Sequence, residues 1–480
     1  MKKRIAAMLL AVVMLMSVLA ACGGSNNAAA PTVAQSGGEA ATTPAPAETT
    51  YDGSEVTIRF YNTMGANLRA VLDAYIVEFN ELYPNIHIEV TQIGNYDDVR
   101  EQISTEIAVG NQPNIAYCYP DHVALYNIAK AVQTLDKYID STVEVTRADG
   151  TTEIMGLTAE QKADFIEGYY NEGRQFGDGL MYSMPMSKST EVLYYNKTFF
   201  DEHKLTVPTT WDEMEAVCAE IKKIDPNSIP LGYDSESNWF ITMTEQYGSP
   251  YTSAEGDHYL FDNEQNHAFV KRFNEWFNKG YLTTQNIYGA YTSGLFTSTT
   301  EVKSYMSIGS SAGATYQRPT AVDGAYPFEV GIATIPQVDA SNPKVISQGP
   351  SLCIFAKDNE QEVIASWLFV KYLTTTVEFQ AEFGMTSGYV PVLKSVGDHP
   401  VYADFIGKAD GGDNIAALSA KVCLAQENAY YTSPAFNGSS EARDQVGALM
   451  SKCLAIKDGD VDAQIAAAFE DAVAECEYNG

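Results

Sequence analysis

The sequence contains few patterns that could support covalent or metal chemistry. The zinc-protease pattern HExxH is absent, and the six histidines are dispersed without ligand spacing. Glycoside hydrolases act through two carboxylates, and a secreted carbohydrate-active enzyme of that kind is the alternative hypothesis. With 62 acidic residues a carboxylate pair is trivial to find, so acidity gives this hypothesis no support. The residue types indicate binding rather than catalysis.

Two short segments could bind small ligands. Ser307–Ala314 (SIGSSAGA) is rich in glycine and serine and could offer backbone N–H groups and hydroxyls to a polar ligand. It lacks the Lys-Ser/Thr ending of a P-loop, which argues against ATP, and a tight turn is the alternative reading. Asp458, Asp460 and Asp462 have calcium-loop spacing. Ala463 and Phe469 occupy the positions of the EF-hand glycine and glutamate, so we reject a calcium site.

The elements that would position a ligand alternate in type along the first part of the body. Apolar spacing predicts strands at Glu55–Tyr61, Ile86–Ile93 and Ile115–Tyr119, with helices at Asn67–Tyr83 and Asp97–Val109 between them. This order predicts a parallel sheet flanked by helices. Ligands collect beyond the carboxyl ends of such strands. The loops at those ends are Asn62–Met64, Asn95–Tyr96 and Tyr119–His122.

The second part of the body begins after a bend at Pro185. Val192–Asn196 predicts a strand covered on both faces, with Val192 and Tyr194 on one side and Leu193 and Tyr195 on the other. We predict further helices at Trp211–Lys223, Phe261–Gly280 and Glu360–Thr374, and a helical, acidic segment over Leu135–Tyr170. We predict further strands at Glu301–Met306, Phe328–Pro336 and Ser347–Phe355.

Length and charge limit the class of protein. A chain of 480 residues is too long for one core and predicts about two domains. The formal net charge of −32 argues against nucleic acid or an anionic membrane surface as the partner. The seven scattered cysteines include no CxxC pair, so we expect most of them to be buried small hydrophobes. A disulfide among the last three remains an alternative.

The N-terminus has the pattern of an export signal. Lys2, Lys3 and Arg4 precede an apolar run, Ile5–Ala21, which ends in LAACG. This ending resembles the bacterial lipoprotein box, in which Cys22 becomes the lipidated first residue of the mature protein. Residues 22–50 then read as a flexible tether. We therefore predict a signal peptide at 1–21 and an extracytoplasmic protein anchored to the cell membrane by lipid on Cys22.

Several stretches together resemble a known family. The segments TIRFYNTMG, IHIEVTQIGNYDDV, SKSTEVLYYNKTFF, TWDEM, MSIGSSAGA, SQGPSL and SGYVPV are similar to the carbohydrate-class extracellular solute-binding proteins of bacterial ABC importers, most of all the glycerol-3-phosphate binders. The resemblance implies an α/β, two-lobe, periplasmic-binding-protein-like fold of type II, hinged by several crossovers. It implies lobe one at 51–183 plus 346–374 and lobe two at 184–345 plus 375–480.

The resemblance also implies a set of ligand-binding residues. They are Tyr96, Ser189, Ser310 or Ser311, Gly349, Tyr389 and Arg443. The tyrosines would stack on the ligand or hydrogen-bond to it, and Arg443 would bind an anionic group through its planar guanidinium. The glycerophosphate binders carry a carboxylate after a Val-Tyr pair. This chain reads Cys118-Tyr119-Pro120-Asp121 there, so Asp121 would replace it one position late.

Each assignment has a structural alternative. Tyr96 could cap the helix at Asp97, and Ser189 with Thr190 could only satisfy the backbone of a crossover. Arg443 could form a surface pair with Glu441 or Asp444, and such pairs contribute little to stability. Trp239, the remaining candidate, is equally compatible with a pocket wall and with the core.

The resulting hypothesis is a lipid-anchored, monomeric receptor of an ABC importer. It would capture a sugar, polyol or glycerol-3-phosphate-like solute in an interlobe cleft and deliver it to the transmembrane subunits of a permease. No cofactor and no enzymatic activity are expected.

Overall fold

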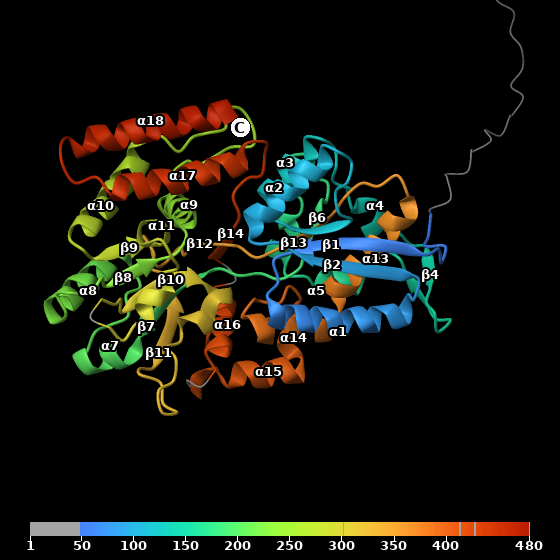
Figure 1. The fold of residues 1–480 in the computed structure, drawn as a ribbon, viewed down its shortest axis with the longest axis horizontal. Helices are drawn as coiled ribbons and strands as arrows, with labels where there is room; N and C mark the ends of the chain where they lie inside the picture. The colour runs from blue at the N-terminus through green and yellow to red at the C-terminus, as the bar shows by residue number, and fades with distance from the viewer. Residues whose placement is uncertain (1–48, 301, 412–413, 427–428, 480) are drawn as a thin grey trace, which may run out of the picture. The chain divides into compact units, whose positions relative to one another are not determined.

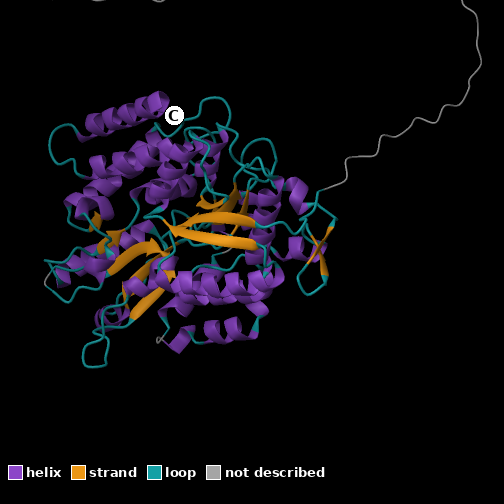
Figure 2. Ribbon diagram, turned by 45° about the vertical axis from the view of Figure 1, so that its right-hand side comes forward, coloured by secondary structure: helices purple, strands orange, loops and turns teal. Residues whose placement is uncertain are grey.

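The computed structural model describes residues 49–300, 302–411, 414–426 and 429–479. The predicted signal peptide, Cys22 and nearly all of the predicted tether lie outside these residues. The described residues contain two five-stranded sheets with helices packed around them (Figure 2). Within the described part of the chain no helix is long and apolar enough to cross a membrane.

The first sheet has the strand order β2-β1-β3-β13-β6 (Figure 1). Its strands are β1 (Val56–Asn62), β2 (Ile86–Gln92), β3 (Ile115–Cys118), β6 (Ser183–Pro185) and β13 (Ser351–Ile354). The first three are parallel, and β13 is antiparallel to both of its neighbours. Helices α1 (Ala66–Leu82) and α2 (Tyr96–Ile107) follow the first two strands, which confirms the predicted alternation. A third helix, α3 (Pro120–Asn127), begins in the segment 119–122, which the sequence predicts as a loop.

The second sheet has the order β11-β7-β10-β8-β9. Its strands are β7 (Glu191–Asn196), β8 (Leu231–Tyr233), β9 (Leu282–Thr284), β10 (Met306–Ser310) and β11 (Val330–Thr334). Around it lie α7 (Lys197–His203), α8 (Trp211–Ile224), α9 (Glu236–Tyr247), α10 (Glu264–Asn278), α17 (Ser439–Leu454) and α18 (Val461–Asn479). The last two helices lie side by side (Figure 1).

The remaining elements connect or cover the sheets. They are α4 (Asp136–Ile139), β4 (Glu144–Thr146), β5 (Thr152–Ile154), α5 (Ala159–Asp164), α6 (Glu167–Glu172), α11 (Gln285–Tyr288), α12 (Ser293–Phe296), η1 (Ser311–Gln317), β12 (Val345–Ile346), α13 (Glu360–Thr375), α14 (Val377–Ser387), η2 (Lys394–Asp398), α15 (Pro400–Gly407), η3 (Ala409–Gly411), α16 (Ile415–Ala425) and β14 (Tyr430–Tyr431).

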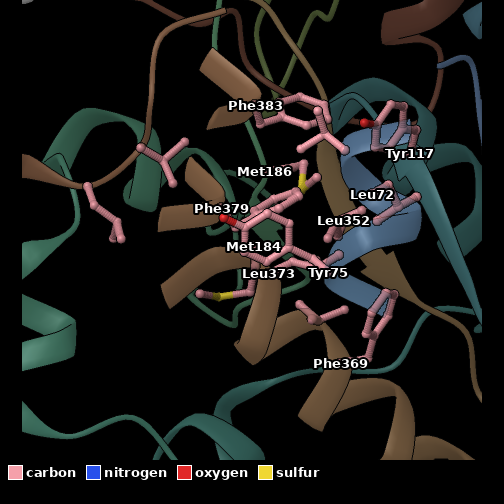
Figure 3. Packing of buried hydrophobic residues seen from close by; sticks show 14 of the residues in the cluster. Leu72, Tyr75, Tyr117, Met184, Met186, Leu352, Phe369, Leu373, Phe379 and Phe383 are labelled. Atoms are coloured by element: carbon pink, nitrogen blue, oxygen red, sulfur yellow. The ribbon is translucent and has the colours of Figure 1, made fainter. Parts of the chain in front are cut away.

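Strand β7 contributes to two hydrophobic cores, as its sequence predicts. Val192 and Tyr194 belong to one buried cluster and Leu193 to the other. The first cluster also joins α1 and β13 to α13 and α14 (Figure 3), and the ring centres of Tyr75 on α1 and Phe379 on α14 lie 5.1 Å apart. Burial on both faces explains why β7 is apolar at consecutive positions.

The helical prediction for Leu135–Tyr170 is wrong in its middle. Residues 144–154 form the hairpin β4–β5, and only short helices flank it. The β-branched residues of TVEVT favour strand. The turn at Asp149-Gly150, where Gly150 has φ of +82°, allows the chain to reverse.

The boundary predicted at the serine-rich loop is also wrong. The strand β10 occupies Met306–Ser310 rather than 301–306, so the first half of the predicted loop is strand and the rest is the 3₁₀ helix η1. Met306 and Ile308 alternate into the second core, and this burial sets the register.

Two crossovers connect the sheets and lie side by side. Residues 186–190 join β6 to β7, and residues 347–350 lead from β12 into β13. Ser189 and Gln348 exchange two backbone hydrogen bonds, each 2.8 Å long. Strand β6 extends the first sheet to Pro185, and helix α14 packs on α1. The lobe boundaries at 183/184, 345/346 and 374/375 stay a prediction.

Candidate functional site

A cavity of about 60 Å³ lies where α3, beyond the first sheet, meets α9 and α17 beside the second. It is lined by Tyr119, Pro120, Asp121, Glu172, Ile241, Tyr251, Thr252, Ile346, Ser347, Gln348, Thr432, Ser433, Pro434, Ser439 and Arg443. Two of the predicted ligand residues, Asp121 and Arg443, therefore line the same small space. Polar groups of both signs surround it, as expected of a site for a polar solute.

Arg443 lies near the start of α17 and faces this cavity. Its guanidinium donates a hydrogen bond to Asn238 Oδ1. Within the described residues no carboxylate oxygen lies within 4.0 Å of the guanidinium. Asp444 instead contacts Arg100 at 3.4 Å, and Glu441 accepts from Gln445. Arg443 therefore forms no surface ion pair with Glu441 or Asp444 in the structure, so that alternative is wrong.

A hydrogen-bonded chain ties Arg443 to the crossovers. Asn238 and Gln348 exchange two side-chain hydrogen bonds of 2.8 Å, and Gln348 pairs through its backbone with Ser189. Ser189 is buried and holds the crossover backbone, as its structural alternative predicted. The orientation of Arg443 is therefore coupled to the segments that join the two sheets.

Asp121 is the acidic group of the cavity. Its Oδ2 accepts a hydrogen bond of 2.8 Å from Ser440 at the start of α17. Burial opposes ionisation, but His122, Arg443 and the Ser440 hydrogen bond outweigh it and hold the pKa of Asp121 below its ordinary value. The cavity wall thus carries an ionised carboxylate and a guanidinium.

Three tyrosines adjoin the cavity. The rings of Tyr96 and Tyr119 lie 4.7 Å apart, and the hydroxyls of Tyr96 and Tyr389 lie 3.3 Å apart. Burial raises the pKa of Tyr96 and of Tyr389, so both stay neutral donors and acceptors. Tyr96 begins α2, but the N-cap is Asn95, whose side chain accepts from the N–H groups of Asp97 and Asp98. Helix capping therefore does not explain Tyr96.

The serine-rich segment at the end of β10 does not line the cavity. Ser310 is exposed and its Oγ accepts from the Ala312 N–H, while Ser311 is fully buried and its Oγ accepts from the Thr190 N–H at 3.2 Å. Gly309–Gly313 matches the GxSxG spacing of a nucleophilic serine. A nucleophile needs an adjacent base and access to substrate, and Ser311 is instead enclosed by its contacts to Thr190 and Ser419.

Gly349 has φ of +95° and lies against the other crossover. A Cβ atom there would lie 2.5 Å from the Ser187 carbonyl oxygen, so only glycine fits the approach. Trp239 is fully buried, stacked on Tyr233 at 4.6 Å and packed on Phe273, and belongs to the core. The structure therefore favours the core alternative for Trp239.

A buried ion pair underlies the cavity. Lys188 Nζ lies 2.6 Å from Glu172 Oε1, and the two side chains are 0% and 3% exposed. Lys188 also donates to the Gly349 carbonyl and to Ser351 Oγ. Glu172 accepts from Ser347 and Thr432 at the cavity. The pair thereby links both crossovers to the segment before α17.

The sequence reasoning missed several residues of the cavity. Tyr119 follows β3, in a loop that was expected to meet ligand, and this position could have indicated it. Gln348, Tyr251 and Glu172 carry no local signal, and neither does Asn238, which contacts Arg443 and Gln348 outside the lining, because their positions depend on contacts between distant segments. In the described residues no group of three His, Cys, Asp or Glu side chains is arranged to bind a metal, and the six described cysteines are buried free thiols.

Glu191 is a buried acid behind the Asn238–Arg443 pair. Tyr233 donates a hydrogen bond of 2.6 Å to its Oε2, and its Oε1 is buried without a partner among the described residues. Burial raises the pKa of Glu191 to about 8, and the Tyr233 hydrogen bond and the charge of Arg443 offset this only in part. The folded protein therefore retains a proton that the unfolded chain releases near pH 4.5.

Replacing Glu191 by glutamine should change how stability depends on pH. Between about pH 4.5 and 8 the unfolded chain ionises this group before the folded protein does, so wild-type stability falls as pH rises. The Glu191→Gln variant lacks this loss and should exceed the wild type by about 2–4 kcal/mol at pH 8 and match it at pH 4. Urea unfolding at both pH values measures the difference. An equal difference at the two pH values would contradict the assignment.

Two sheets with a polar cavity between them are typical of the two-lobe class of binding proteins. Comparison with known proteins identifies the family. A family model described as bacterial extracellular solute-binding protein matches residues 74–407. The chain belongs to this family, and the curated relatives that it matches are named as binding proteins, not as enzymes.

Relatives and solved structures agree with this membership. The sn-glycerol-3-phosphate-binding periplasmic protein UgpB of Escherichia coli strain K12 is 24% identical over 383 residues, which cover 74% of this chain and 79% of that protein. The structure of UgpB from Mycobacterium tuberculosis in complex with glycerophosphocholine has a TM-score of 0.69 at 16% identity and covers 88% and 99% of the two chains. The sugar-binding protein MalE of Xanthomonas citri has a TM-score of 0.68 at 18% identity, with 88% and 98% coverage. These similarities confirm the two-lobe fold.

Proposed function

We propose that the protein is a lipid-anchored receptor of an ABC importer that captures a glycerol-3-phosphate-like solute and delivers it to a membrane permease. The observation that carries the proposal is Arg443, a guanidinium facing the cavity with an amide oxygen as its protein partner and no carboxylate within 4.0 Å among the described residues. Such a group can bind a phosphate through two parallel N–H donors. The name of the UgpB relatives supports the same ligand class.

The remaining groups suit the polyol part of such a solute. The ionised Asp121 would accept hydrogen bonds from solute hydroxyls, and Tyr96, Tyr119 and Tyr389 would provide flat surface with polar edges. The same tyrosines also suit a neutral sugar. In this proposal the solute favours the form in which the lobes are closed, and that form docks on the permease.

The anchor is part of the proposal and rests on sequence alone. Cys22 follows the lipoprotein-like LAA segment and would carry the lipid, with residues 23–50 as the tether. The protein would act as a monomer outside the cytoplasmic membrane.

Thermal unfolding with a panel of solutes tests the proposed function. The panel holds sn-glycerol-3-phosphate, glycerophosphocholine, glycerol, maltose and maltotriose. A solute at about 100 times its Kd stabilises the folded protein by roughly 2.7 kcal/mol, which raises the melting temperature by a few degrees. We expect a shift with the phosphorylated solutes. A shift with sugars alone would retain the receptor and reject the anionic solute, and no shift at all would contradict the proposal.

A further inference from the structure

Residues 251–260 form a hairpin between α9 and α10 that reaches the cavity. Thr252 pairs with Tyr259 across it, and backbone hydrogen bonds join Leu260 to Tyr251 and Ser253 to His258. Tyr251 and Thr252, on its first strand, line the cavity together with Arg443. The hairpin therefore brings two residues with hydroxyl groups to the wall of the cavity that Arg443 also lines.

Both hydroxyls are buried without a hydrogen-bond partner. Tyr251 Oη and Thr252 Oγ1 have no partner among the described residues. An unsatisfied buried hydroxyl costs about 1–3 kcal/mol of stability, so buried hydroxyls nearly always have a hydrogen-bond partner. Where the protein provides none, a bound ligand can be that partner. Here both hydroxyls belong to residues that line one small cavity.

The ring of Tyr251 is fixed, so its hydroxyl has a defined position. It packs against Phe240 and Phe261 of the second core, with ring centres 6.3 and 6.2 Å away. Burial raises the pKa of Tyr251, and the neighbouring Arg443 offsets this only in part, so the hydroxyl remains a donor at neutral pH. A rigid donor beside a guanidinium suits an oxygen that carries negative charge.

We infer that the hairpin supplies two ligand-binding residues, Tyr251 and Thr252, whose hydroxyls donate to the anionic group that Arg443 binds. This inference rests on the proposed function and specifies its chemistry. A cavity of about 60 Å³ has room for roughly four water molecules, so groups on its wall can reach one compact anion. Three donors together with Asp121 would then select a phosphorylated polyol.

Single-hydroxyl deletions test the inference with a matched control in the same hairpin. Tyr251→Phe and Thr252→Val each remove one hydroxyl, and Tyr259→Phe removes a hydroxyl from the opposite strand, where the ring packs on Phe436. Calorimetric titration with sn-glycerol-3-phosphate should show roughly tenfold weaker binding for each of the first two variants and wild-type binding for the control. The melting temperature without solute should stay the same or rise, because each deletion removes an unsatisfied polar group.

The outcomes separate the inference from the proposed function. Wild-type affinity in both Tyr251→Phe and Thr252→Val would overturn the inference and leave the receptor intact. A wild-type protein that binds maltose but not sn-glycerol-3-phosphate would overturn the anion-binding role of the hairpin while solute capture stands. A wild-type protein that binds no solute of the panel would overturn both. Weaker binding accompanied by an equal loss of solute-free stability would assign the hydroxyls a structural role and also overturn the inference.

Discussion

Replacing Lys188 by methionine is expected to lower the free energy of unfolding by about 3–5 kcal/mol. Methionine has nearly the same length, so the packing changes little, but Glu172 is left as a charge that is 3% exposed and has lost its cation. The variant also loses the contacts from Lys188 Nζ to Gly349 and Ser351, which hold the second crossover. Urea unfolding followed by tryptophan fluorescence measures the change.

Two further variants distinguish the buried charge from a general effect of removing a lysine. Lys197 also pairs with acids, at 2.9 and 3.2 Å, but its side chain is 38% exposed, so Lys197→Met should cost less than about 1 kcal/mol. The double variant Lys188→Met with Glu172→Gln should recover part of the loss, because no unpaired charge remains. A Lys188→Met protein as stable as Lys197→Met would contradict the structural role of the pair.

Replacing Arg443 by glutamine is expected to weaken binding of sn-glycerol-3-phosphate at least about 100-fold. The guanidinium is the cation of the cavity wall, and Asp121 would repel the phosphate once that cation is absent. Binding of a neutral solute should change much less, because it does not use the charge. Titration calorimetry measures both affinities.

A surface arginine provides the control for this prediction. Arg272 of α10 pairs with Asp212 of α8 at 2.6 Å and lies outside the cavity lining, so Arg272→Gln should bind the phosphorylated solute like the wild type. The outcome that rejects the anion-binding role is a loss of less than threefold in Arg443→Gln. An equal loss in Arg272→Gln would instead indicate an effect of net charge.

The sequence predicts the elements of the fold well where periodicity is strong. The strands and helices of the first sheet follow the predicted order because each buries one apolar face, and β7 follows prediction because both of its faces are buried. The segment 144–154 is predicted as part of a helical, acidic region, but it forms a hairpin with its turn at Asp149-Gly150. Local turn chemistry decides such a segment, and a search for helical periodicity misses it.

The site is only partly readable from the sequence. Of the residues that the family resemblance indicates, Asp121 and Arg443 line the cavity, and Tyr96 and Tyr389 lie beside it. The cavity lining does not include the other indicated residues, Ser189, Ser310, Ser311 and Gly349. Asn238 donates to Gln348 and accepts from Arg443, and both hydrogen bonds join residues more than 100 positions apart, so the spacing along the chain does not predict them. The hairpin at 251–260 is likewise defined by where it packs.

Trp239 illustrates the limit for large aromatic residues. Its type suits a solute-stacking wall and a core equally well, and only its position on α9 decides between them. The helix turns this side chain toward Tyr233 and Phe273, away from solvent, while Ile241 on the same helix reaches the cavity.

Calorimetric titration of the purified protein with sn-glycerol-3-phosphate tests the central claim most directly, with the solute recovered afterwards and checked by NMR. We predict saturable binding of one solute per protein, with the solute recovered unchanged. Heat that continues after saturation together with altered solute would indicate turnover and contradict a binding protein. The absence of binding by sn-glycerol-3-phosphate would contradict the assignment of Arg443 as the group that recognises the solute.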